Sequence, residues 1–233
     1  MKRRDFLVLT AGAVGLATAQ RPVNVIEAVT APATAPLRAA ELVATGLRSH
    51  GRLRNVWLKV TLGWARHPST AVNSNPTVVR EVCERLFATG TERVTLVDRL
   101  YQPRRLVEAV SGFSALFSND ARVRIAVLPC FDQTEEDRAA LQFEPDALIS
   151  LEPAKHHVRV GLTGITRPSE ALPDAIIRKR LGSLLDATRV LTQGGPEGGC
   201  STDVKESGRI AWSTSGGALD SWAETVTGLW RRS

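Results

Sequence analysis

The sequence predicts a single α/β domain in which a mostly parallel sheet is flanked by helices. Segments with strand character alternate with segments of helical apolar spacing along nearly the whole chain. The 233 residues are 43% hydrophobic and 23% charged, which is typical of a globular protein and excludes extensive disorder or a coiled coil. No stretch reaches the roughly 18 uninterrupted apolar residues that a membrane span requires, so we expect no span in the mature chain.

The first twenty residues resemble an export signal. Arg3 and Arg4 are followed by an apolar stretch from Phe6 to Leu16 and then by Ala17-Thr18-Ala19. Small residues in this arrangement suit signal peptidase, and we expect cleavage before Gln20. The paired arginines are typical of a twin-arginine signal, which a receptor recognises. An amphipathic first helix with arginines placed by chance is the alternative.

This signal predicts where the protein is found. The twin-arginine export machinery becomes an expected partner, and the mature chain is expected to be periplasmic or secreted. The net charge of the whole chain is +6, and residues 1–19 hold three basic residues and one acidic residue, so the mature chain carries +4. Its basic residues form no cluster with interleaved aromatics, so we expect no nucleic acid as a partner.

The mature chain divides into a short leader and one domain. Residues 20–36 contain Pro22, Pro32 and Pro36, which predict an extended leader, and residues 37–233 are expected to form the α/β domain. The first expected helix covers residues 37–50 and ends before Gly51. In the next helix Asn75 is the N-cap, Pro76 occupies the first position and Gly90 marks the end.

The remaining elements follow from the same patterns. Runs of β-branched and aliphatic residues predict strands at 55–62, 93–98, 123–128, 147–151, 184–191 and 210–213. Apolar residues at helical spacing predict helices at 103–110, 134–141, 171–181 and 218–230. No internal repeat interrupts this alternation.

Ligands of open α/β sheets bind beyond the carboxyl ends of the strands. The stretches at these ends are residues 63–67, 98, 130–132, 152–157 and 193–200. Asp98 and His157 are candidate acids or bases, and Lys59, just upstream of the first stretch, is a candidate stabiliser of negative charge.

Lysine is rare in this chain, with five residues against 25 arginines. A chain with this bias that retains Lys59 and Lys155 is expected to need a compact ammonium group at these places. Two solvated lysines placed by chance remain the alternative. His156 is a second candidate for ligand binding, and the alternative is that His156 and His157 are satisfied or surface histidines.

The segment Gly194-Gly195-Pro196-Glu197-Gly198-Gly199 follows an expected strand. Its glycines (Gly194, Gly195, Gly198 and Gly199) allow the backbone to approach a ligand, and its N–H groups are candidate donors to an anion. A tight turn between two elements explains the same residues. The segment matches neither a Walker loop nor a dinucleotide-binding fingerprint.

The three cysteines are far apart in the sequence. Cys83 lies in a helical apolar stripe and is expected to be a core thiol, whereas Cys130 and Cys200 are candidates for a disulfide. No Cys-x-x-Cys or His-Glu-x-x-His pattern occurs, so we expect no metal site, and no motif identifies a cofactor.

Taken in order, several segments resemble the domain of unknown function 362 family. These segments are Val56-Trp57-Leu58-Lys59, the helix opening at Asn75-Pro76-Thr77-Val78-Val79, the strand Arg93 to Asp98, Asp146 to Ser150, Lys155-His156-His157, Gly161-Leu162-Thr163-Gly164, and Asp186 to Leu191 with the glycine segment and Ala211-Trp212-Ser213-Thr214. The chain lacks the ferredoxin-like cysteine cluster that many members carry, and the asparagine that follows the first strand in the family is absent. The resemblance implies an α/β fold and an association with redox systems.

Three functions agree with these observations. The first is an exported protein that binds an anionic ligand or cofactor through Lys155, His156 and the glycine segment, with a periplasmic redox protein as a partner. The second is an enzyme that uses Lys59, Asp98 and His157 in a reaction that the sequence does not identify. The third is a non-catalytic assembly or interaction domain.

Overall fold

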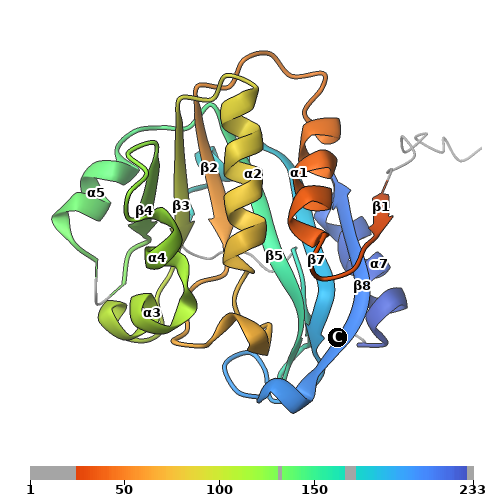
Figure 1. Ribbon diagram of the computed structural model, residues 1–233. Coiled ribbons are helices and arrows are strands. Elements are labelled where there is room, and N and C mark those ends of the chain that lie inside the picture. The colour runs from red at the N-terminus through yellow and green to blue at the C-terminus, as the bar shows by residue number, and fades with distance from the viewer. Residues whose placement is uncertain (1–24, 131–132, 166–171, 230–233) are drawn as a thin grey trace, which may run out of the picture.

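An eight-stranded mixed sheet is the centre of the fold (Figure 1). The computed structural model describes residues 25–130, 133–165 and 172–229, so the predicted signal peptide with Arg3 and Arg4 lies outside the described residues. The strands are β1 (Ile26–Val29), β2 (Asn55–Val60), β3 (Arg93–Asp98), β4 (Val123–Val127), β5 (Ala147–His157), β6 (Gly161–Thr163), β7 (Arg180–Leu191) and β8 (Val204–Ser213). Their order is β1-β8-β7-β5-β2-β3-β4, and β6 pairs with β5.

The α/β class is confirmed, but the sheet is mixed where the sequence predicted a mostly parallel one. Parallel pairing joins β4, β3, β2, β5 and β7. The pairs β7–β8, β1–β8 and β5–β6 are antiparallel. Only residues 192–203 connect β7 to β8, and they contain no crossover helix that a parallel return would require. β1 lies within residues 20–36, the stretch predicted as an extended leader, and pairs with β8.

Helices cover both faces of the sheet. The described helices are α1 (Ala35–Gly46), α2 (Pro76–Ala88), α3 (Arg104–Ser111), α4 (Phe113–Phe117), α5 (Glu135–Leu141), α6 (Asp174–Ile177) and α7 (Gly216–Thr227), with short 3₁₀ turns at Pro68–Thr70 and Ser201–Asp203. α1 and α2 lie side by side on one face (Figure 1). α7 packs on β7 and β8, in a second apolar cluster that includes Leu185, Ala211 and Leu219.

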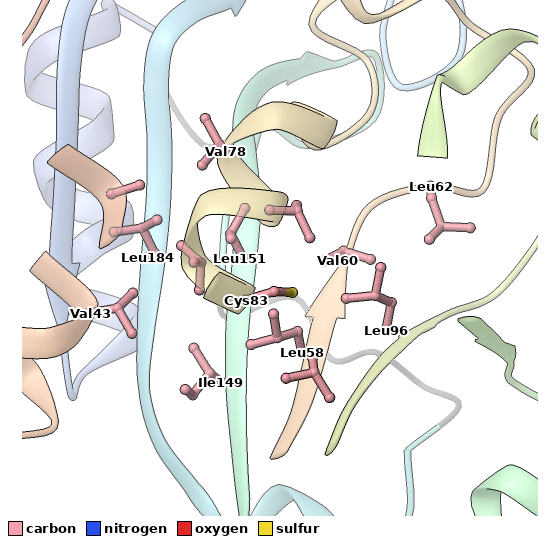
Figure 2. Close-up of a cluster of buried hydrophobic side chains, with 14 of the residues drawn as sticks. Val43, Leu58, Val60, Leu62, Val78, Cys83, Leu96, Ile149, Leu151 and Leu184 are labelled. Atoms are coloured by element: carbon pink, nitrogen blue, oxygen red, sulfur yellow. The ribbon is translucent and has the colours of Figure 1, made fainter. Parts of the chain in front are cut away.

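The main core lies between α2 and the parallel strands. Asn75 caps α2 by accepting a hydrogen bond from the Thr77 N–H at 3.1 Å, as its sequence predicted. Figure 2 shows Cys83 of α2 beside Leu58 and Val60 of β2. Burial raises the pKa of the Cys83 thiol, so this residue is the core thiol that the helical stripe predicted.

Several element bounds differ from those expected. β3 matches its predicted range, whereas β5 continues six residues beyond the predicted end at 151. The helix expected over 171–181 is reduced to α6, and residue 171 lies outside the described part of the chain. Arg180 already pairs with Leu148 of β5, so pairing with the sheet ends the helix early.

No helix in the described ranges is long and apolar enough to cross a membrane. All three cysteines are free, so the candidate bridge between Cys130 and Cys200 is not formed.

Candidate functional site

Three parallel strands bring one lysine and two carboxylates together where β2 and β3 end. Lys59 is on β2, Asp98 is the last residue of β3, and Glu152 is on β5. The Nζ atom of Lys59 lies 3.0 Å from Asp98 Oδ1 and 2.9 Å from Glu152 Oε1. It also donates to the Val60 carbonyl oxygen at 2.8 Å. An ammonium group has three N–H donors, so these contacts use all of them.

The two carboxylates are held in turn by the chain that follows β2. Asp98 Oδ2 accepts a hydrogen bond from the Leu62 N–H at 2.7 Å, and Glu152 Oε2 accepts one from the Thr61 hydroxyl. Together, Lys59, Thr61, Asp98 and Glu152 form the Lys59 cluster, in which the side chains of the three charged residues are at most 13% exposed. The sequence predicted Lys59 and Asp98 as catalytic candidates, and the fold places them in direct contact.

The charges explain the protonation of Lys59. Burial alone lowers the pKa of this ammonium, but attraction to Asp98 and Glu152 outweighs burial and raises the pKa above its ordinary value. Lys59 is therefore permanently charged and fully hydrogen-bonded. Its contacts neutralise one of the two negative charges in its own cluster and leave no donor for a further anion.

Lys155 has a different environment. Lys155 is 2% exposed, and its Nζ atom donates a hydrogen bond to the Val72 carbonyl oxygen. This is the only hydrogen bond of the Lys155 side chain within the described residues, so two of its three ammonium N–H donors have no such partner. Burial lowers the pKa of Lys155 to about 8, although Glu152 and Asp98 partly oppose this effect and Lys59 adds to it.

Residues 63–75, the covering segment, cross the carboxyl ends of the strands. Near β3 the segment is attached by the Tyr101 N–H, which donates to the Gly63 carbonyl at 2.9 Å. Towards β7 and β8, Arg66 Nε donates to the Glu197 carbonyl at 2.6 Å, and Arg189 donates to the Pro68 carbonyl at 3.1 Å. The segment thus spans the sheet edge from β3 to β7, and its Val72 carbonyl contacts Lys155.

The two histidines follow Lys155 along β5. His157 is 8% exposed, and its Nδ1 accepts a hydrogen bond from the Arg159 N–H at 3.2 Å in the turn before β6. No hydrogen bond joins His157 to the Lys59 cluster among the residues described. The Nδ1 atom of His156 is buried and has no hydrogen-bond partner in the same part of the chain.

The glycine segment folds tightly against the end of β5. The Gly198 N–H donates to the Gly194 carbonyl at 2.9 Å, and the Val158 N–H donates to the Gly195 carbonyl at 3.0 Å. A Cβ atom on Gly195 would lie 1.8 Å from the His156 carbonyl oxygen, and one on Gly199 would lie 2.5 Å from Leu191 Cδ1. These close approaches explain the glycines by packing alone. A ligand role for the segment stays a prediction.

The sequence did not predict a role for Glu152, Thr61 or Val72. Glu152 lies in one of the stretches at strand ends, and its position directly after an apolar strand was the available signal. Val72 acts through its backbone carbonyl, which no side-chain pattern reveals. Within the described ranges no group of three His, Cys, Asp or Glu side chains is arranged to hold a metal ion.

Neither a family model nor a curated protein matches this sequence.

Proposed function

We propose that this chain is an exported protein that binds a small anionic ligand or cofactor at Lys155, beneath the covering segment. The observation that carries the proposal is the buried ammonium of Lys155 with its single hydrogen bond. A buried charged group with unused donors is costly, and an anionic oxygen accepting those donors would compensate for the lost solvation.

Two arginines of the same sheet edge favour an anion. Arg66 and Arg189 donate to the backbone carbonyls of Glu197 and Pro68. Neither forms an ion pair within the described residues, and each adds positive charge next to the covering segment. The Lys59 cluster has two carboxylates and one ammonium, so its net negative charge offsets only one of the nearby positive charges. The sheet edge therefore still attracts an anion.

The resemblance to the domain of unknown function 362 family supports the wider setting. The motif order and the twin-arginine pattern at Arg3 and Arg4 favour export in the folded state, which suits a protein that acquires its ligand before export. Under this proposal the mature chain is periplasmic or secreted and serves a redox system through a periplasmic partner.

Titration with inorganic phosphate, followed by calorimetry and by the melting temperature, tests the binding site. Lys155→Met should abolish phosphate binding, whereas Lys205→Met, which removes an exposed lysine of β8, should leave it unchanged. Equal phosphate affinity in the wild type and Lys155→Met would overturn the site. The absence of any phosphate-induced stabilisation would favour an assembly or interaction domain instead.

An enzyme is the second candidate, and the lowered pKa of Lys155 favours it. An amine whose pKa is about 8 exchanges protons near neutral pH, and the carboxylates of Asp98 and Glu152 act on it electrostatically. In this function Lys155 is the acid or base, and His157 is a further candidate. Once a turnover is measured, Lys155→Met should abolish it, and His157→Ala separates the role of the histidine from that of the lysine.

A further inference from the structure

Trp64 and Tyr101 form an aromatic shelf at the same edge of the sheet. Their rings are stacked with centroids 4.8 Å apart and an interplanar angle of 15°. Tyr101 is 56% exposed although its ring packs against Trp64. The shelf thus offers aromatic surface to solvent, and the contact with Trp64 helps to orient the exposed ring.

Hydrogen bonds from backbone N–H groups fix the positions of both residues of the shelf. The Tyr101 N–H donates to the Gly63 carbonyl at 2.9 Å, and the Ala65 N–H donates to Gln102 Oε1 at 2.6 Å. A Cβ atom on Gly63 would lie 2.6 Å from the Arg99 carbonyl oxygen and 2.7 Å from Tyr101 Cδ2. Glycine at 63 is therefore required for the close approach of the two segments.

The shelf is part of the architecture that encloses Lys155. Trp64 belongs to the covering segment, whose Val72 carbonyl accepts the hydrogen bond from Lys155. Asn73 of this segment donates from Nδ2 to the Trp64 carbonyl at 2.7 Å, directly beside Val72. Tyr101 follows Asp98 of the Lys59 cluster by three residues. The aromatic surface and the buried amine are thus two parts of one sheet edge.

We propose that the ligand carries a planar aromatic ring that stacks on Tyr101, in addition to the anionic group that reaches Lys155. This inference rests on the proposed function and specifies the chemical class of its ligand. Stacking on an oriented ring stabilises a planar partner beyond the burial of its apolar area. A ligand with both groups would bridge from β3 to β5, which are separated only by β2.

Flavin mononucleotide and ribitol 5-phosphate are matched probes, because they share the phosphate and the flexible ribityl chain and differ in the planar ring. We expect flavin mononucleotide to bind at least tenfold more tightly in calorimetric titrations. Tyr101→Leu should weaken flavin mononucleotide by about three- to tenfold, corresponding to the strength of one aromatic pair, and leave ribitol 5-phosphate unchanged. Tyr101→Phe, which keeps the ring, should retain the affinity.

The two proposals fail in different ways. Equal affinity for both probes, with both lost in Lys155→Met, would overturn the aromatic shelf as a ligand site and keep the anion site. Failure of both probes and of inorganic phosphate to bind would overturn the anion site and the inference that rests on it. Quenching of flavin fluorescence in the wild type, reduced in Tyr101→Leu, would support direct stacking.

Discussion

The Nζ atom of Lys59 lies 3.0 Å from the Oδ1 atom of Asp98, on a neighbouring parallel strand. The side chains are 10% and 8% exposed, and Glu152 of β5 contacts the same ammonium. One lysine therefore links three adjacent strands. Because all three N–H donors of the Lys59 ammonium are used, we expect Lys59 to stabilise the sheet edge that carries the ligand site.

Lys59→Met should lower the free energy of unfolding by about 3–5 kcal/mol, because it leaves two buried carboxylates without their cation. Chemical denaturation at pH 7 measures this effect. The matched control is Arg38→Ala, which breaks the exposed pair between Arg38 and Glu41 and should cost less than about 1 kcal/mol. Equal effects of the two variants would contradict a structural role for the buried pair.

The titration of Lys155 predicts a rise in stability with pH. Its pKa is about 8 in the folded protein and has the ordinary value of 10.5 in the unfolded chain. Between these values the unfolded chain binds a proton that the folded protein lacks, so the free energy of unfolding increases with pH. The full increase corresponds to about 3 kcal/mol.

Denaturation of ligand-free protein from pH 7 to pH 10 checks this prediction. The wild type should gain stability relative to Lys155→Met across the range, since the variant has no amine to titrate. A constant difference between the two proteins would show that Lys155 does not have a lowered pKa.

The buried carboxyl of Asp186 should make the free energy of unfolding decrease with pH, opposite to the effect of Lys155. Burial raises the pKa of this carboxyl above 3.8, although hydrogen bonds from Thr188 and the charge of Arg189 oppose the effect. Stability is therefore lost as the pH rises above 3.8, because the unfolded chain releases its proton first. Asp186→Asn should become more stable relative to the wild type between pH 4 and pH 7, and a constant difference between the two proteins over this range would contradict a raised pKa of Asp186.

Gly182 packs against Trp212 and should not tolerate a larger side chain. A Cβ atom on Gly182 of β7 would lie 2.2 Å from Trp212 Cζ2, and the indole is 2% exposed. Gly182→Ala should therefore lower the free energy of unfolding by about 1–3 kcal/mol through overpacking. Gly51→Ala is the control, because a Cβ atom there has no other heavy atom within 4 Å. A comparable loss in both variants would refute packing against Trp212 as the cause.

Local signals predicted much of the fold. The N-cap and first proline of α2 are adjacent to the helix in the sequence, so they predicted where it begins. The strand from Arg93 to Asp98 has its predicted bounds. The direction of β8 depends on antiparallel pairing with β7, which precedes it in the chain, and with β1, which lies far away in the sequence. Periodicity reports which residues are buried, but it does not report the direction of a strand, so the mixed sheet was not predicted.

The candidate site was predicted where it depends on strand ends. Lys59 and Asp98 meet because parallel strands place their carboxyl ends at one edge. The use of every Lys59 donor, the Val72 carbonyl above Lys155 and the stacking of Trp64 on Tyr101 arise from the course of the covering segment. That course is set by tertiary hydrogen bonds, which leave no pattern in the sequence.

Native mass spectrometry of the protein exported through its own signal tests whether Lys155 holds an anionic ligand. We expect the wild type, cleaved before Gln20, to retain a non-protein mass that carries a phosphate or carboxylate group, and Lys155→Met to lose it. A bare wild-type chain that also fails to bind inorganic phosphate would contradict the claim that Lys155 holds an anionic ligand.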